Sequence, residues 1–185
     1  HPFRKVISFQ DLVVICQQVI AAKESFANCL RVRLQFILPE GEIREAAYLE
    51  LKKSNLATLL PPSDFSVPTD PKWFKVILEK LIDISMLLSL GQPNPSVSLS
   101  LAKVDDQNIV VSVGGVSLQL SRQYQQELFK EYYGILFQRT NLKLGSGLEG
   151  FIAKLVADEL GISIEVETDG ANLNFKLRMT KNLKA

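Results

Sequence analysis

The paired glycines Gly145 and Gly147 stand where a turn opens into an amphipathic helix, in the sequence GSGLEGFIAKLVADEL. Such a turn can present several unpaired backbone N–H groups to an anion, and the positive end of the helix dipole adds to the attraction. The pattern therefore predicts a candidate phosphate-binding turn. The same pattern also occurs at ordinary junctions between a loop and a helix, so the rest of the chain has to decide between the two.

The composition limits the classes of protein to consider. The chain has 185 residues, 46% of them hydrophobic, which is enough for one compact domain. It carries 21 Lys and Arg against 20 Asp and Glu, without a run of like charges, so we expect no binding to nucleic acid. The longest apolar run, over residues 82–90, is too short to cross a bilayer, and we expect no membrane contact by this segment.

Few residues could do covalent or metal chemistry. His1 is the only histidine, and the two cysteines, Cys16 and Cys29, form neither a zinc nor a disulfide pattern. We therefore predict no catalytic residue and no metal site, and we expect a reducing cytoplasmic location. Because the chain does not begin with Met and has no signal pattern, we interpret residues 1–185 as one domain from a longer protein.

Hydrophobic periodicity predicts a mixture of helices and strands in the first half of the chain. Ser8-Phe9-Gln10-Asp11 has the form of a capping box and predicts a helix over about residues 9–25. Alternating apolar residues over 32–36 and 47–51 predict two strands, which we interpret as a hairpin. The proline-rich stretch 60–68 is predicted to be a loop or an edge strand.

The second half has clearer boundaries. Asp70 and Pro71 supply an N-cap and a first helical residue, which predicts a helix that reaches about Ser89. The sequence then predicts a hairpin, a helix, a second helix and a closing hairpin, over residues 97–113, 123–137, 147–160 and 162–177. The expected fold class is an α/β (α+β) two-layer sandwich, in which about three helices cover one face of a mixed, mostly antiparallel sheet.

This order of elements resembles the ATP-binding domain (HATPase, Bergerat fold) of sensor histidine kinases and of their gyrase, Hsp90 and MutL relatives. The resemblance covers about residues 8–180. TDPKWFKVILEKLID resembles the family's segment with two asparagines on a helix, and FKEYY at residues 129–133 resembles its phenylalanine box. GSGLEG resembles its second glycine box, in which Gly145, Gly147 and Leu148 match the family pattern.

The departures from this family affect its nucleotide contacts. In active members the two asparagines of the helix hold Mg²⁺, but Lys80 and Ile84 stand here, and neither side chain offers an oxygen ligand. The carboxylate that accepts from the adenine amino group falls at Gly115, and the third glycine of the second box is Glu149. The resemblance thus implies a vestigial nucleotide site that binds no cofactor. Its members are Lys80, Ile84, Gly115, Gly145, Gly147 and Leu148.

Two interpretations stay open at this level. Leu87, Leu88 and Leu90, together with residues 135–137, either fill the space that a nucleotide takes in active members or form an exposed patch for another domain, and we favour filling. Lys80 either belongs to a solvated helix face, which we favour, or reaches an acidic partner.

These patterns favour a catalytically silent pseudo-ATPase domain of a sensor histidine kinase-like signalling protein. We expect it to contact other domains of the same protein and a response regulator, and to be part of a homodimer formed by upstream helices. One alternative is an ATP-dependent histidine kinase domain with an atypical nucleotide pocket, which would use ATP and Mg²⁺. Another is a phosphotransfer adaptor for a response regulator. Resemblance in fold cannot decide between these functions.

Overall fold

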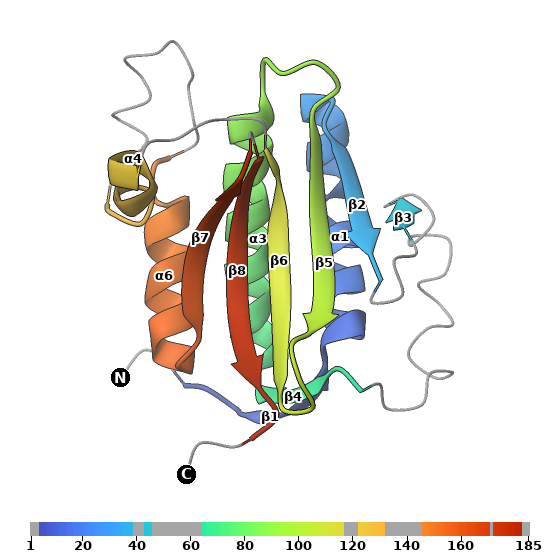
Figure 1. Ribbon diagram of the computed structural model, residues 1–185, viewed down its shortest axis with the longest axis vertical. Coiled ribbons are helices and arrows are strands. Elements are labelled where there is room, and N and C mark those ends of the chain that lie inside the picture. The colour runs from blue at the N-terminus through green and yellow to red at the C-terminus, as the bar shows by residue number, and fades with distance from the viewer. Residues whose placement is uncertain are drawn as a thin grey trace.

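The computed structural model describes residues 4–38, 43–45, 64–116, 122–131, 146–170 and 172–182. These residues form a sheet that is covered by helices on one face (Figure 1). The strands are β1 (Ser8–Asp11), β2 (Arg33–Ile37), β3 (Ile43–Glu45), β4 (Ser66–Thr69), β5 (Ser96–Lys103), β6 (Asn108–Val116), β7 (Ser163–Asp169) and β8 (Asn172–Thr180). The helices are α1 (Leu12–Leu30), α3 (Pro71–Ser89), α4 (Arg122–Glu127) and α6 (Glu149–Leu160).

The main sheet has six strands in the order β3-β2-β5-β6-β8-β7. Only β2 and β5 pair in parallel, and every other neighbouring pair in this sheet is antiparallel. Strands β1 and β4 form a separate two-stranded antiparallel sheet. Helices α1, α3 and α6 lie behind the main sheet, and α3 packs against both of the others (Figure 1). The predicted two-layer fold, with a mixed and mostly antiparallel sheet, is therefore confirmed.

The core lies between the sheet and the three long helices. Apolar residues of the central strands alternate with polar ones, so that one face of each strand is buried against the helices. The register places Val113 opposite both Leu99 of β5 and Phe175 of β8, and all three side chains are fully buried. The predicted hairpins in the second half of the chain are thus confirmed, and they set the position of α3.

Helix α3 has the predicted bounds. One side-chain oxygen of Asp70 accepts from the N–H groups of Lys72 and Trp73, at 3.0 and 3.1 Å, and Pro71 occupies the first turn. The second half of the helix is buried on most sides because α1, α6 and the sheet surround it. Its last residue is Ser89, as the sequence predicts.

The start of α1 differs from the prediction. The N-cap is Asp11, whose side chain accepts from the N–H of Val13 at 2.9 Å, and the predicted cap Ser8 instead begins β1. The Ser8 hydroxyl accepts from the side chain of Gln10 and so does not cap a helix. The helix also runs on to Leu30, where Arg31 ends it in the left-handed conformation.

Three further expectations are only partly tested. The predicted strand 47–51 lies outside the described residues, and β3 is the segment that pairs with β2. The helix expected over residues 123–137 is seen as α4 and a following turn, and residues 132–145 also lie outside the described part. The stretch predicted as a loop or an edge contains β4, whose one strand partner among the described residues is β1. No described helix combines the length and the apolar character needed to cross a bilayer.

Candidate functional site

The turn before α6 keeps part of the geometry of an anion-binding turn. Gly147 is buried and has a φ of 77°, a conformation that favours glycine. Leu148 is the N-cap residue of α6, and no side chain at that position caps the helix. The predicted member Gly145 lies outside the described residues. The start of α6 therefore has backbone N–H groups whose partners must come from elsewhere.

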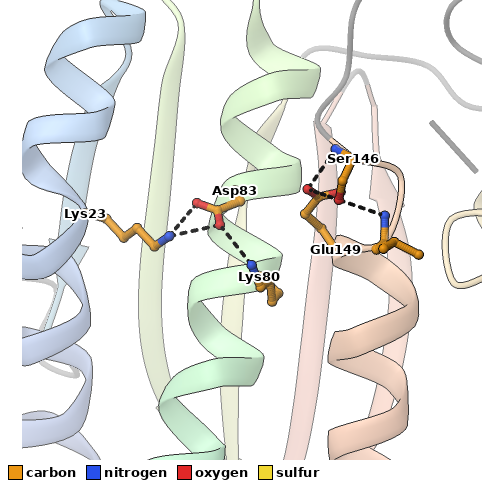
Figure 2. Close-up of polar contacts among 6 residues, drawn as sticks. Lys23, Lys80, Asp83, Ser146 and Glu149 are labelled. Carbon is orange, nitrogen blue, oxygen red and sulfur yellow. Dashed lines mark hydrogen bonds and ion pairs between the residues drawn. The ribbon is translucent and has the colours of Figure 1, made fainter. Parts of the chain in front are cut away.

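The side chain of Glu149, the first residue of α6, folds back over this turn (Figure 2). Its Oε1 atom accepts hydrogen bonds from the backbone N–H of Ser146 at 3.1 Å and from the Ser146 hydroxyl at 2.9 Å. The same hydroxyl oxygen accepts from the N–H of Leu148 at 3.3 Å. The carboxylate of Glu149 is thus the negatively charged group that this turn binds.

The environment of Glu149 keeps its side chain charged. Burial raises the pKa of the carboxyl, but hydrogen bonds from Ser146 and from the Glu149 backbone, together with the nearby charge of Lys80, outweigh it. The net effect is a pKa below the ordinary value. The turn therefore carries a fixed negative charge at neutral pH, which repels a phosphate group.

Lys80 is on the part of α3 that faces the beginning of α6. Its ammonium nitrogen lies 4.0 Å from Oδ2 of Asp83, and its charge acts on Glu149. Its side chain is 32% exposed, so this face of α3 is partly solvated. Asp83 lies one turn further along α3 itself, whereas Glu149 belongs to α6, which packs against α3.

Asp83, which pairs with Lys80, is also paired with a second lysine. Lys23 of α1 donates to both of its oxygens, at 2.7 and 2.9 Å, and Figure 2 shows Asp83 between the two lysines. The Asp83 side chain is 12% exposed, so this ion pair joins α1 to α3 in a largely dry environment. Among the described residues, no group of three His, Cys, Asp or Glu could hold a metal ion.

Ile84 lies one turn further along α3 and contacts the start of α6. It is 8% exposed, and its Cδ1 atom is 3.5 Å from the position that a Cβ on Gly150 would take. Ser85, next to it, is fully buried and donates its hydroxyl to the carbonyl of Leu81 at 2.8 Å. A Mg²⁺ ion that bridges phosphates needs several oxygen ligands, and these residues offer none that is free. The donor set at this place does not fit Mg²⁺.

Gly115, where the resemblance places the adenine-binding carboxylate, has a closely packed backbone. Its φ is 106°, and a Cβ at this position would lie 2.8 Å from the backbone carbonyl oxygen of Ser96 on β5. A β-bulge interrupts the pairing of β6 with β8 between Gly114 and Val116. The backbone here accepts only glycine, so no residue with a carboxylate can stand at this position without a shift of the chain.

The structure shows two residues of this region whose roles the sequence analysis missed. A Cβ on Gly150 would lie 1.9 Å from the carbonyl oxygen of Leu128, so Gly150 allows the segment after α4 to approach α6. The side-chain oxygen of Asn174 occupies the place of a Cβ on Gly114. Both contacts join segments that are far apart in the sequence, and no local pattern signals them.

The leucines at the end of α3 take part in the core. Leu88 is 2% exposed, and Leu87 and Leu90 are partly buried and pack against the core cluster. Phe129 of the predicted phenylalanine box meets Phe175 edge to face, with ring centroids 6.1 Å apart. Residues 135–137 lie outside the described part of the chain. The described leucines thus favour filling over an exposed patch.

Comparisons with known proteins agree with this fold. No family model matches the sequence, and neither does any curated protein. Among solved structures, the histidine kinase AdeS of Acinetobacter baumannii superposes with a TM-score of 0.66 and 15% identity, over 98% of this chain and 70% of that one. The nucleotide-free catalytic domain of histidine kinase ThkA gives a TM-score of 0.68 and 14% identity, over 95% of this chain and 96% of that one.

A further structure contains ThkA in complex with the response regulator protein TrrA. Its TM-score is 0.64 at 14% identity, over 95% of this chain and 42% of that one. At these identities the superpositions establish the fold and leave the activity open. The chain therefore has the ATPase-like fold of sensor histidine kinase catalytic domains.

Proposed function

We propose that this chain is the catalytically silent, ATPase-like domain of a histidine kinase-like signalling protein, and that it acts through contacts with other protein domains. One observation carries the proposal, namely that the Glu149 carboxylate accepts hydrogen bonds from the turn that would otherwise contact a phosphate. The backbone N–H groups of Ser146 and Leu148 in this turn thus have acceptors within the chain.

Two further positions support the same conclusion. Ile84 contributes a buried hydrocarbon where active members of the resembling family place a metal ligand, and Gly115 offers no carboxylate for adenine. Each polar ligand group that is buried without a partner costs about 1–3 kcal/mol. Together with repulsion from Glu149, these losses weaken the binding of ATP by several orders of magnitude.

Binding of a fluorescent ATP analogue, with and without Mg²⁺, tests this proposal. We expect no saturable binding to the wild-type chain at millimolar nucleotide, and no effect of Mg²⁺. An active histidine kinase catalytic domain serves as the positive control. Saturable binding that depends on Mg²⁺ would contradict the proposal and support a functional nucleotide site.

An ATP-dependent histidine kinase with an atypical pocket is the second candidate. It is favoured by the glycine conformation of Gly147 and by Lys80, whose ammonium group could face a phosphate if Glu149 moved aside. This candidate predicts nucleotide binding that increases when Glu149 is replaced by glycine. The silent domain predicts no nucleotide binding in that variant either, because Ile84 and Gly115 remain.

The proposed function also implies binding partners and a location for the protein. We propose contacts with other domains of a longer protein, a homodimer formed by upstream helices, a cytoplasmic location and a response regulator as an external partner. ThkA, which shares the fold, has been solved together with the response regulator TrrA, and this supports the last point. A phosphotransfer adaptor remains the third candidate, and transfer of radiolabelled phosphate from the full-length protein to a response regulator would identify it.

A further inference from the structure

Residues 4–7, called the strap from here on, are bonded to the beginning of α3. The N–H of Val6 donates to Oδ2 of Asp70 at 2.6 Å. The indole N–H of Trp73 donates to the carbonyl of Arg4 at 3.5 Å. Asp70 is the N-cap of α3, and Trp73 belongs to its first turn. The strap is thus joined to the residues at which α3 begins.

The strap buries little apolar surface. Residues 4–7 are all exposed, and the side chains of Val6 and Ile7 are 63% and 43% exposed. Lys5 donates to the carbonyl of Glu159 at 2.5 Å, also at an exposed position. Strand β1, which follows the strap, pairs with β4 alone within the described part of the chain. A segment that is held by exposed hydrogen bonds opens at a lower free energy than the core. We therefore expect the strap to open while the rest of the fold stays intact.

Asp70 uses its two side-chain oxygens for two different segments. Oδ1 accepts from the N–H groups of Lys72 and Trp73, at 3.0 and 3.1 Å, whereas Oδ2 accepts from Val6. Because both oxygens belong to one planar carboxylate, a rotation that follows Val6 also turns Oδ1 away from the helix. Asp70 is 4% exposed, so water does not readily replace either partner. The cap of α3 and the hold on the strap therefore depend on each other.

We propose that the strap and Asp70 form a conformational device, in which release of residues 4–7 loosens the first turn of α3 and loosening of that turn releases the strap. Such a coupling is a free energy between two sites and acts equally in both directions. The device connects the N-terminal segment to the helix that carries Lys80 and Ile84. It goes beyond the proposed function and does not depend on it, because Asp70 and Ile84 lie in opposite halves of α3.

The first arm of the test changes the strap and measures α3 by NMR amide exchange. Val6→Pro removes the donor to Asp70, and the loss of one hydrogen bond should raise the population of the open strap about fivefold. We expect the backbone amides of Lys72 and Trp73 to exchange at least about twofold faster than in the wild type. Val6→Ala keeps the backbone N–H and removes only an exposed side chain, so it should keep the wild-type rates.

The second arm changes α3 and measures the strap. Asp70→Asn keeps an oxygen for the helix N–H groups but replaces the acceptor of Val6 by an NH₂ donor. The indole N–H of Trp73, the only tryptophan of the chain, should then exchange at least about twofold faster, because Arg4 leaves together with Val6. Asp105→Asn removes one charge in the turn between β5 and β6 and should leave the indole exchange unchanged.

Three outcomes would overturn the device. Wild-type exchange of the two α3 amides in Val6→Pro would make the strap a passive anchor, and so would wild-type indole exchange in Asp70→Asn. The amide of Gln107, which a carboxylate also accepts, is the internal reference, and its equal acceleration in Val6→Pro would indicate a general change. An unchanged chemical shift of Val113, in the centre of the sheet, verifies that each variant folds. Binding of MgATP by the chain would overturn the proposed function but would leave the device intact.

Discussion

The two ends of the α3 and α6 pair use carboxylates in different ways. At one end, Asp70 caps α3 and also accepts from the N-terminal segment, and it is 4% exposed. At the other end, Glu149 accepts from the turn before α6 and remains partly exposed. Both carboxylates occupy helix N-termini, where a negative charge is stabilised. Asp70 holds secondary structure together, whereas Glu149 occupies a position where a phosphate could bind.

Under the proposed function, the difference illustrates how a ligand site can be lost without loss of the fold. The packing at the Glu149 end involves Ile84, Gly150 and Leu128, which meet at the start of α6. At the opposite end, a groove of about 690 Å³ is lined by residues of α6, of β8 and of the N-terminal segment. We infer that the Glu149 end has become structural.

The largest expected effect on stability comes from a substitution of Gly115, which lies at the Glu149 end of the sheet. Gly115→Asp would restore the family's carboxylate, but it should destabilise the chain by at least about 3 kcal/mol, because of the positive φ and the close carbonyl of Ser96. Gly161→Ala at the other end is the matched control. Its φ is also positive but its Cβ would meet nothing within 4 Å, so the cost should be about 1 kcal/mol.

Urea unfolding followed by circular dichroism measures both variants. Equal costs for Gly115→Asp and Gly161→Ala would mean that the contact with Ser96 does not constrain the chain. In that case the family's carboxylate could be restored without damage to the fold, and the distinction between the two ends would be weaker.

The next largest effect compares how much the carboxylates of Asp70 and Glu149 each contribute to stability. Asp70→Ala should cost about 2 kcal/mol, because it removes a helix cap and leaves the N–H of Val6 without its acceptor. Glu149→Ala should cost under about 1 kcal/mol, since its bonds are partly exposed and screened by solvent. The free energy of unfolding in urea measures both. A larger cost for Glu149→Ala would reverse the assignment of structural roles.

Much of the fold could be predicted because its signals are local. Asp70 and Pro71 identify the start of α3, and alternation around Val111 and Phe175 identifies the hairpins of the sheet. The start of α1 was misplaced because Ser8 and Asp11 are both good caps, and only the pairing of β1 with β4 decides between them. Tertiary contacts overrode a valid local pattern there.

The candidate site could be predicted in its residues but not in its contacts. The sequence places Glu149 next to a glycine turn, but it does not show that the side chain folds back to Ser146. It also does not show that Lys80 lies near Glu149, because that depends on how α3 packs against α6. The groove at the other end is lined by segments that are distant in sequence, so no motif could indicate it.

The smallest expected effect is the contribution of Glu149 to the pH dependence of the unfolding free energy. Its pKa in the folded chain lies below its ordinary value of 4.5, so the unfolded chain binds more protons near that pH. The stability that the carboxylate adds is therefore fully present above pH 4.5 and is lost as the pH falls through the lower, folded pKa. The difference in unfolding free energy between wild type and Glu149→Gln should shrink on acidification. A difference that grows at low pH would contradict this sign.

Isothermal titration of MgATP into the chain tests the central claim most directly, namely that the Glu149 end no longer serves a nucleotide. We predict no binding heat up to millimolar MgATP, for the wild type and for Glu149→Gly alike, because Ile84 and Gly115 still lack the required oxygen atoms. A dissociation constant in the micromolar range for the wild-type chain would contradict the account.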